Sequence, residues 1–143
     1  MNALVGLFWL LAAWLGGADD DPECLVLGGL DAARAQAFVS GDTEGLRDVY
    51  VDAHAARADV EVLHSYDERG LRLDGLLLVR ESCRVSDRSE RRLTLDVVDR
   101  LGPTTVQAAD GHRRDLPLDR PTRRTVVLTR TEDGWRVAVV RGS

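Results

Sequence analysis

Lysine is absent from this chain of 143 residues, because all 19 basic residues are arginine. We attribute this to the codon usage of a G+C-rich bacterial genome rather than to chemistry. No glycine-rich phosphate loop, internal repeat or low-complexity segment occurs. Acidic and basic residues are interleaved along the chain, and the net charge is -5. The sequence therefore predicts no face that is built to meet nucleic acid.

Cysteine is scarce, with Cys24 and Cys83 as the two cysteines of the chain and no CxxC motif. This pattern indicates neither a cysteine metal site nor redox catalysis. His54 and His64 are ten residues apart and fall on different faces of an expected helix, so they do not form a metal-binding pair. We expect no metal ion and no cofactor.

The first eighteen residues carry no charge and are apolar from Ala3 to Leu15. This run has the length of a signal-peptide core and is shorter than the roughly 20 residues that span a bilayer. We predict a signal peptide or membrane anchor in residues 1–18, a linker in 19–23 and one domain in 24–143. The protein would then be extracytoplasmic, secreted or anchored to the cell membrane. A buried N-terminal helix of the domain is the alternative.

Export would change the state of the two cysteines, since thiols of small domains are usually oxidised outside the cytoplasm. We predict a disulfide between Cys24 and Cys83. Such a bridge would close a loop of about 59 residues and would stabilise the domain by roughly 4 kcal/mol in the chain-entropy account. The alternative is a pair of unpaired, buried cysteines that act as small apolar side chains.

Three helices are predicted before residue 70. Apolar residues recur at steps of three and four between positions 23 and 40, and Gly41 ends this helix. Asp42 or Thr43 is a suitable N-cap for a short second helix. A third helix is expected over residues 53–69, with Asp52 as its N-cap and Gly70 after its end.

After Gly70 the apolar period changes from 3.6 to 2, which predicts antiparallel strands. Residues 71–85 form one long strand or two strands with a bend at Gly75. The returning strand covers residues 93–101, a small hairpin forms around Asp110-Gly111, and Asp133-Gly134 joins the last two strands. Helices ahead of consecutive strands predict an α+β fold, with N-terminal helices packed on a curved antiparallel β-sheet.

Two segments resemble the nuclear transport factor 2-like superfamily. "LDAARAQAFVSGDTEGLRDVYV" (30–51) is similar to the opening helices of that family, and "RRTVVLTRTEDGWRVAVV" (123–140) is similar to its last hairpin. The resemblance implies a cone-shaped fold with a cavity between helices and sheet. It implies no single activity, since members include isomerases, cyclases, dehydratases and domains without catalysis. In layout the chain resembles small actinobacterial proteins in which such a domain follows a membrane segment.

Four side chains are candidates for a cavity site. Glu81 and Asp99 have the parity of the apolar strand face, where a carboxylate is costly to ionise. With a turn near residue 88, Glu81 would face Leu95 and Asp99 would face Leu77, so the two acids are not paired. Tyr50 and Tyr66 lie on inward helical stripes and could direct a phenol into the cavity, although core packing is the alternative for both.

These features favour a non-enzymatic extracytoplasmic domain that binds a small apolar ligand or a membrane-associated protein partner. Residues 1–18 would provide contact with a membrane, and the last hairpin has apolar residues on both faces, which is compatible with a homodimer. The alternative is a small isomerase-like or cyclase-like enzyme that uses Glu81 or Asp99 with Tyr50 or Tyr66.

Overall fold

The first helix among the described residues ends at a glycine. The structure, a computed structural model, describes residues 20–142, so the predicted signal peptide or anchor lies outside the described residues. Helix α2 runs over Cys24–Ser40, and Gly41 follows with a left-handed backbone at φ 68°. This conformation suits glycine because it has no side chain to clash. The predicted helix over residues 23–40 is confirmed.

The next two helices each begin at an aspartate cap. Helix α3 covers Thr43–Arg47, and the Asp42 carboxylate accepts a hydrogen bond of 3.0 Å from the backbone N–H of Gly45. Helix α4 covers Ala53–Glu68, and Asp52 accepts one of 2.8 Å from the N–H of Ala55. Each carboxylate satisfies a backbone donor that has no partner inside its own helix. The predicted order of three helices before the strands is confirmed.

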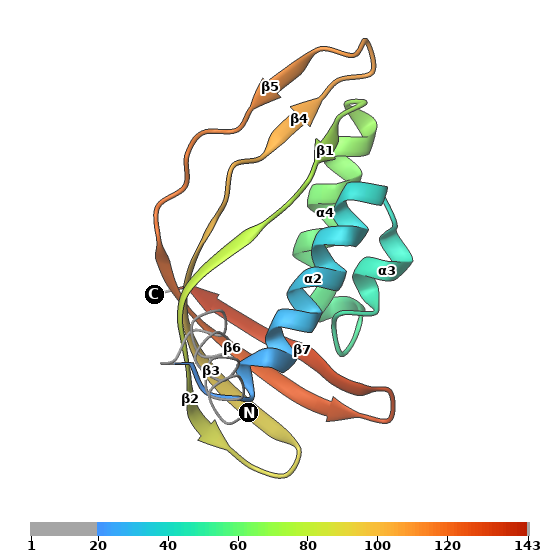
Figure 1. Cartoon of the computed structure of the whole chain (residues 1–143). Coiled ribbons are helices and arrows are strands. Elements are labelled where there is room, and N and C mark those ends of the chain that lie inside the picture. Colours follow the sequence, from blue (N-terminus) through green and yellow to red (C-terminus); the bar gives the residue numbers. More distant parts are fainter. Residues whose placement is uncertain (1–19, 143) are drawn as a thin grey trace, which may run out of the picture.

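Seven strands follow and form two antiparallel sheets, of which the larger has the order β2-β3-β6-β7 and the smaller the order β1-β4-β5. The strands are β1 (Arg72–Asp74), β2 (Leu78–Arg88), β3 (Arg92–Leu101), β4 (Thr105–Gln107), β5 (Arg113–Asp115), β6 (Thr122–Thr131) and β7 (Gly134–Gly142). The helices gather on one side of both sheets (Figure 1). The α+β architecture predicted from the sequence is therefore confirmed, including the bend after β1 at Gly75, where φ is 85°.

The register of β2 against β3 differs from the one expected. Asp99 pairs with Arg80, and Leu95 pairs with Val85, so the expected pairings of Asp99 with Leu77 and of Leu95 with Glu81 are wrong. The turn is centred between residues 90 and 91, later than expected, and β2 carries two bulges. Each bulge inserts one residue into β2 and changes which side chains face inward.

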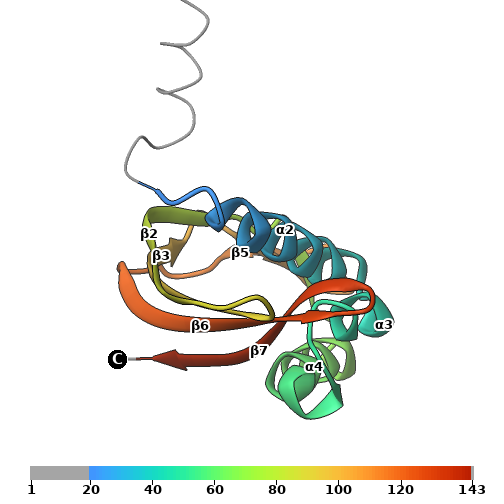
Figure 2. The ribbon, with the colours of Figure 1, turned by 90° about the horizontal axis from the view of Figure 1, so that it is seen from below.

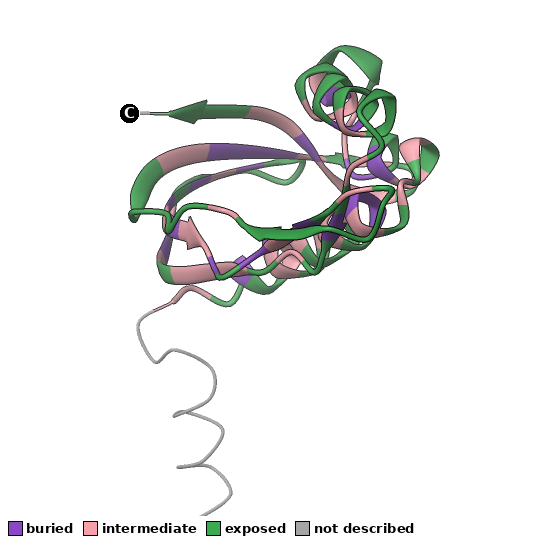
Figure 3. Cartoon of the chain, turned by 90° about the horizontal axis from the view of Figure 1, so that it is seen from above, coloured by how far each residue is buried: buried purple, intermediate pink, exposed green. Residues whose placement is uncertain are grey.

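Two apolar cores lie between the helices and the strands. One joins the start of α2 to the larger sheet through Leu27, Leu95 and Leu128. The other joins the end of α2 to α4 and the smaller sheet through Phe38 and Leu63. Figure 3 shows buried positions on both the strands and the helices, whereas the strand end at the C-terminus is exposed. This division leaves the middle of α2 between two separate cores.

A disulfide connects the first turn of α2 to strand β2. Cys24 and Cys83 form an S–S bond of 2.03 Å, which confirms the predicted bridge. Asp20 and Asp21, just ahead of α2, accept hydrogen bonds from the N–H groups of Cys83 and Val85 at 3.0 and 2.8 Å. The chain thus enters the domain along the outer edge of β2, beside α2 (Figure 2).

Within residues 20–142, no helix is long and apolar enough to cross a membrane.

Candidate ligand cavity

An open cavity of about 590 Å³ lies between α2, α4 and the strands. Its walls include apolar members of both cores, such as Leu27, Phe38 and Leu73. Val62 on α4 and Val140 on β7 also line it, and 45% and 48% of their surfaces are exposed. A volume of this size falls within the range of pockets that hold small molecules.

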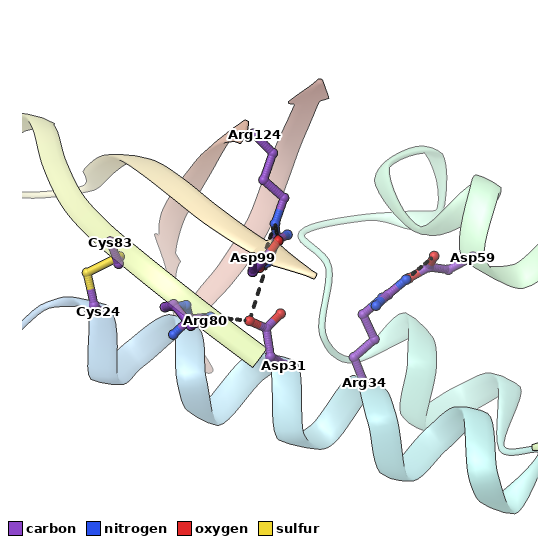
Figure 4. A network of polar contacts seen from close by, with 8 residues as sticks. All are labelled: Cys24, Asp31, Arg34, Asp59, Arg80, Cys83, Asp99 and Arg124. Carbon is purple, nitrogen blue, oxygen red and sulfur yellow. Dashed lines mark hydrogen bonds and ion pairs between the residues drawn. A yellow bond between two sulfur atoms is a disulfide. The ribbon is translucent and has the colours of Figure 1, made fainter. Parts of the chain in front are cut away.

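One group of charged side chains joins α2 to the sheet beside this cavity. The Arg124 guanidinium on β6 donates three hydrogen bonds of 2.7 to 3.2 Å to both oxygens of Asp99 on β3. Its Nη2 is also 3.5 Å from Oδ2 of Asp31 on α2. Arg80 on β2 donates to the same oxygen of Asp31 at 2.5 Å. Figure 4 shows this chain of contacts running from the helix across three strands.

A second group joins α2 to α4. Arg34 donates two hydrogen bonds to the two oxygens of Asp59, at 2.5 Å from Nε and 2.9 Å from Nη2. The Tyr50 hydroxyl donates a short hydrogen bond to Asp59 Oδ2. The Arg34 guanidinium carbon is 5.1 Å from the centre of the Phe38 ring, a cation–π distance. Asp31, Arg34 and Phe38 follow one face of α2 at helical spacing, so one helix face serves both groups.

The surroundings shift the pKa values of these groups in different directions. Burial raises the pKa of Asp31, although three arginines oppose the shift. Burial also acts to raise the pKa of Asp59, but the hydrogen bonds and charge of Arg34 outweigh it and the pKa falls below its ordinary value. Burial, followed by the hydrogen bond to Asp59, raises the pKa of Tyr50. Tyr50 therefore keeps its proton, which it donates to Asp59.

The structure brings three of the four expected site residues to the cavity. Tyr50, Tyr66 and Asp99 line it. Glu81 is exposed and is the extra residue of the bulge between Arg80 and Ser82. The expected position of Glu81 on the inner face is wrong, because the bulge directs Arg80 inward in its place. Ligand binding by the three lining residues stays a prediction.

Sequence reasoning missed the arginines and the helix aspartates. A signal for Asp31 and Arg34 was present, because Leu27, Asp31, Arg34 and Phe38 occur at steps of four, three and four, which places charges in a buried helical stripe. Arg80 had no such signal, since its inward direction depends on the bulge.

Within residues 20–142, no group of three or more His, Cys, Asp or Glu side chains is arranged to hold a metal ion.

Chemically, the cavity combines apolar walls with charges that are matched inside the protein. Asp99 and Asp59 each use both carboxylate oxygens on an arginine. The first of these pairs joins β3 to β6 and the second joins α2 to α4, so they fix the walls of the cavity relative to one another. The Tyr50 proton is engaged by Asp59, so this phenol does not have a free proton to donate to an oxyanion in this arrangement.

Solved structures share the fold of this chain at low sequence identity. The intermembrane space region of the chloroplast protein ARC6 is similar with a TM-score of 0.61 and 15% identity, over 82% of this chain and 90% of that one. A protein of the NTF2-like family from Streptomyces avermitilis is similar with a TM-score of 0.53 and 14% identity, over 82% and 95%. An NTF2-like protein of unknown function in nutrient uptake from Rhodospirillum rubrum is similar with a TM-score of 0.52 and 19% identity, over 82% and 96%.

Sequence comparison adds no closer relationship. No protein-family model matches the chain, and no curated protein matches it either. The structural similarities show that the chain has the nuclear transport factor 2-like fold that its sequence resembles. Because proteins with one fold carry out many different reactions, function has to be argued from the cavity itself.

Proposed function

We propose that this nuclear transport factor 2-like domain is a non-enzymatic binding module that takes a small, largely apolar molecule into its cavity. The observation that carries the proposal is the position of the cavity between two apolar cores, with its Asp99 and Asp59 carboxylates already paired with arginines. Apolar walls supply most of the binding free energy of small ligands, and a few fixed polar groups orient them.

An isomerase-like or cyclase-like activity has less support from the geometry. A general base must accept a proton, and Asp99 has both oxygens occupied by Arg124. Stabilising an oxyanion needs a free donor, and of the two expected tyrosines Tyr50 already donates its hydroxyl proton to Asp59. Glu81, the other expected base, is exposed in the bulge of β2. We therefore propose binding without a chemical step.

We also propose that the domain acts outside the cytoplasm, either secreted or held at the cell membrane by residues 1–18. The support is the disulfide between Cys24 and Cys83, whose residues are 4% and 0% exposed. A bridge of this kind persists in oxidising compartments and is rare in the cytosol. Protein recovered from its native host, denatured without reductant and titrated for thiols should show none. Two free thiols would contradict this location.

Native mass spectrometry of the full chain tests the binding function. The protein, purified from its native host without detergent, should carry a small organic molecule that organic solvent extracts. A tryptophan at position 58 should block the cavity, because Ala58 is an exposed residue of α4 that lines it. Ala58→Trp should lose the bound mass. Ala33→Trp is the matched control, since Ala33 is exposed on α2 and does not line the cavity.

Two results would contradict the proposed binding function. Retention of the same mass by Ala58→Trp and Ala33→Trp would place the ligand elsewhere and contradict the proposal. The same would hold if neither the native protein nor a protein soaked with apolar probes bound any small molecule. Thermal unfolding of both variants shows whether they are folded. A folded Ala58→Trp that lacks the ligand has a blocked cavity, and it should unfold at a lower temperature than a variant that keeps the ligand, because a bound ligand stabilises the folded state.

A further inference from the structure

Asp31 has one carboxylate oxygen that the ion pairs leave open. Arg80 and Arg124 both approach Oδ2, at 2.5 and 3.5 Å, and neither is hydrogen-bonded to Oδ1. In Figure 4 the second oxygen of Asp31 lies on the side of the Arg34–Asp59 pair. Asp31 is also one of the residues that line the cavity. The cavity wall therefore contains an acceptor whose orientation is fixed by two arginines.

A donor follows the acceptor one turn later on the same helix. Arg34 also lines the cavity, and it uses Nε and Nη2 on Asp59. A guanidinium carries five N–H groups in a rigid plane, and the two bonds to Asp59 together with the contact to Tyr50 do not use all of them, so Arg34 can also donate to another acceptor. Positions three apart on a helix lie on one face. Asp31 and Arg34 thus present an acceptor and a donor side by side to the same space.

The surrounding charges decide which polar group of a ligand fits between Asp31 and Arg34. A cation at Asp31 would lie near Arg34, Arg80 and Arg124, which all act on that carboxylate. An anion at Arg34 would lie near Asp31 and Asp59. Like charges at such distances repel strongly in a partly buried site. A neutral hydroxyl avoids both costs, because it donates to Asp31 and accepts from Arg34.

We infer that the cavity selects neutral, hydroxyl-bearing apolar molecules, with the hydroxyl held between Asp31 Oδ1 and Arg34 and the apolar body against the cavity walls. This inference rests on the proposed binding function and adds the class of ligand. Asp31 thereby acts as the specificity-determining residue, and the arginines on its other oxygen hold its position. The raised pKa of Asp31 agrees with a carboxylate that has fewer partners than its burial demands.

Four probes that share one ring system test the selection on the full chain. They are naphthalene, 2-naphthol, 2-naphthoate and 2-naphthylmethylammonium, with dissociation constants measured by calorimetry at neutral pH. Naphthol should bind roughly tenfold more tightly than naphthalene, since a hydrogen bond to a charged group has about that effect on affinity. The anion and the cation should bind more weakly than naphthol. Equal binding of naphthol and naphthalene, or tightest binding of either ion, would overturn the inference.

The failures of the inference and of the proposed function are distinguishable. If naphthalene binds but naphthol has no advantage, the apolar cavity stands and the hydroxyl site falls. If none of the four probes binds, the proposed function falls and the inference falls with it. The probe series uses the unmodified protein, so its result does not depend on whether any variant folds.

A substitution assigns the preference to Asp31. Asp31→Asn removes the charge of the acceptor with little change in shape, so the ratio of naphthol affinity to naphthalene affinity should fall from about ten towards one. Glu81→Gln is the matched control, because it removes a carboxylate that is exposed and does not line the cavity. It should keep the tenfold advantage. An advantage that survives Asp31→Asn would overturn the assignment.

Discussion

Asp31 on α2 and Asp99 on β3 meet at a single guanidinium, that of Arg124 on β6. Arg124 Nη2 is 2.7 Å from Asp99 Oδ2 and 3.5 Å from Asp31 Oδ2. Asp31 is seven residues after Cys24, and the disulfide attaches that earlier turn of the helix to β2. Helix α2 is therefore held to the sheet at two points two turns apart, one covalent and one ionic. Asp31, Asp99 and Arg124 all line the cavity.

Removal of the ionic contact should cost stability. Asp99 is 4% exposed, so Asp99→Asn would leave the charge of Arg124 with only the longer contact to Asp31. Removing one partner of a largely buried ion pair costs up to about 3 kcal/mol when a second, longer contact remains, and chemical denaturation would detect this as a lower free energy of unfolding. Asp96→Asn is the control on the same strand, because Asp96 is exposed. It should change stability by less than about 0.5 kcal/mol. Equal effects of the two substitutions would show that the Arg124 pair does not stabilise the fold.

Loss of the disulfide should lower stability by a similar amount. The bridge spans a sequence separation of 59 residues. Replacement of Cys24 and Cys83 by alanine should reduce the free energy of unfolding by up to about 4 kcal/mol, because the unfolded chain regains the conformations that the loop excluded. Denaturant unfolding of the double variant beside the oxidised protein measures this difference. The second comparison is the oxidised protein with reductant added. Its free energy of unfolding should approach that of the double variant once the bridge is reduced. A variant as stable as the oxidised protein would contradict the expectation.

The pair between Asp59 and Arg34 should make stability depend on pH in acid. The pKa of Asp59 in the folded protein is lowered from its ordinary value of 3.8. A lowered pKa means that the folded state binds the proton more weakly than the unfolded state, so the stabilisation is present above pH 3.8 and is lost as the pH falls through the folded value. Asp59→Asn should destabilise by about 1 to 3 kcal/mol at neutral pH, and the difference should shrink in acid.

Denaturation at a series of pH values measures this difference. Asp67→Asn on the same helix is the control, because Asp67 is exposed and its contact with Arg72 is 3.5 Å. Exposed pairs of this kind contribute less than about 1 kcal/mol. A difference between Asp59→Asn and the unmodified protein that stayed constant from neutral pH into strong acid would rule out the pair with Arg34 as its origin.

Replacement by alanine should change stability in opposite directions at two glycines, one inside α2 and one directly after it. Gly29 lies inside α2, and a Cβ there would meet no atom within 4 Å, so Gly29→Ala should stabilise by about 1 kcal/mol through helix propensity. Gly41 has a φ of 68°, and a Cβ there would overlap the guanidinium of Arg72. Gly41→Ala should destabilise by about 1 kcal/mol or more. Shifts of the same sign in thermal unfolding would contradict the assigned end of α2.

Much of the fold follows from local features of the sequence. The aspartates at 42 and 52 begin two helices, Gly41 ends another, and Asp133-Gly134 joins the last two strands. Each of these signals acts within a few residues, so it can be recognised without knowledge of distant contacts. The disulfide was predicted from the scarcity of cysteine and the apolar N-terminal run, because two thiols in an exported domain have only one intramolecular pairing.

The site was decided by tertiary structure. One residue inserted at Glu81 moves that acid outward and brings Arg80 to Asp31, and alternation along the strand could not reveal where the bulge lies. The sequence alone determined the helices, the strands and the cysteine pair, because these depend on spacing and local backbone preference. Only the folded chain determined that arginines from β2 and β6 would meet an aspartate of α2, because their distances depend on strand register and on how the helix packs across the sheet.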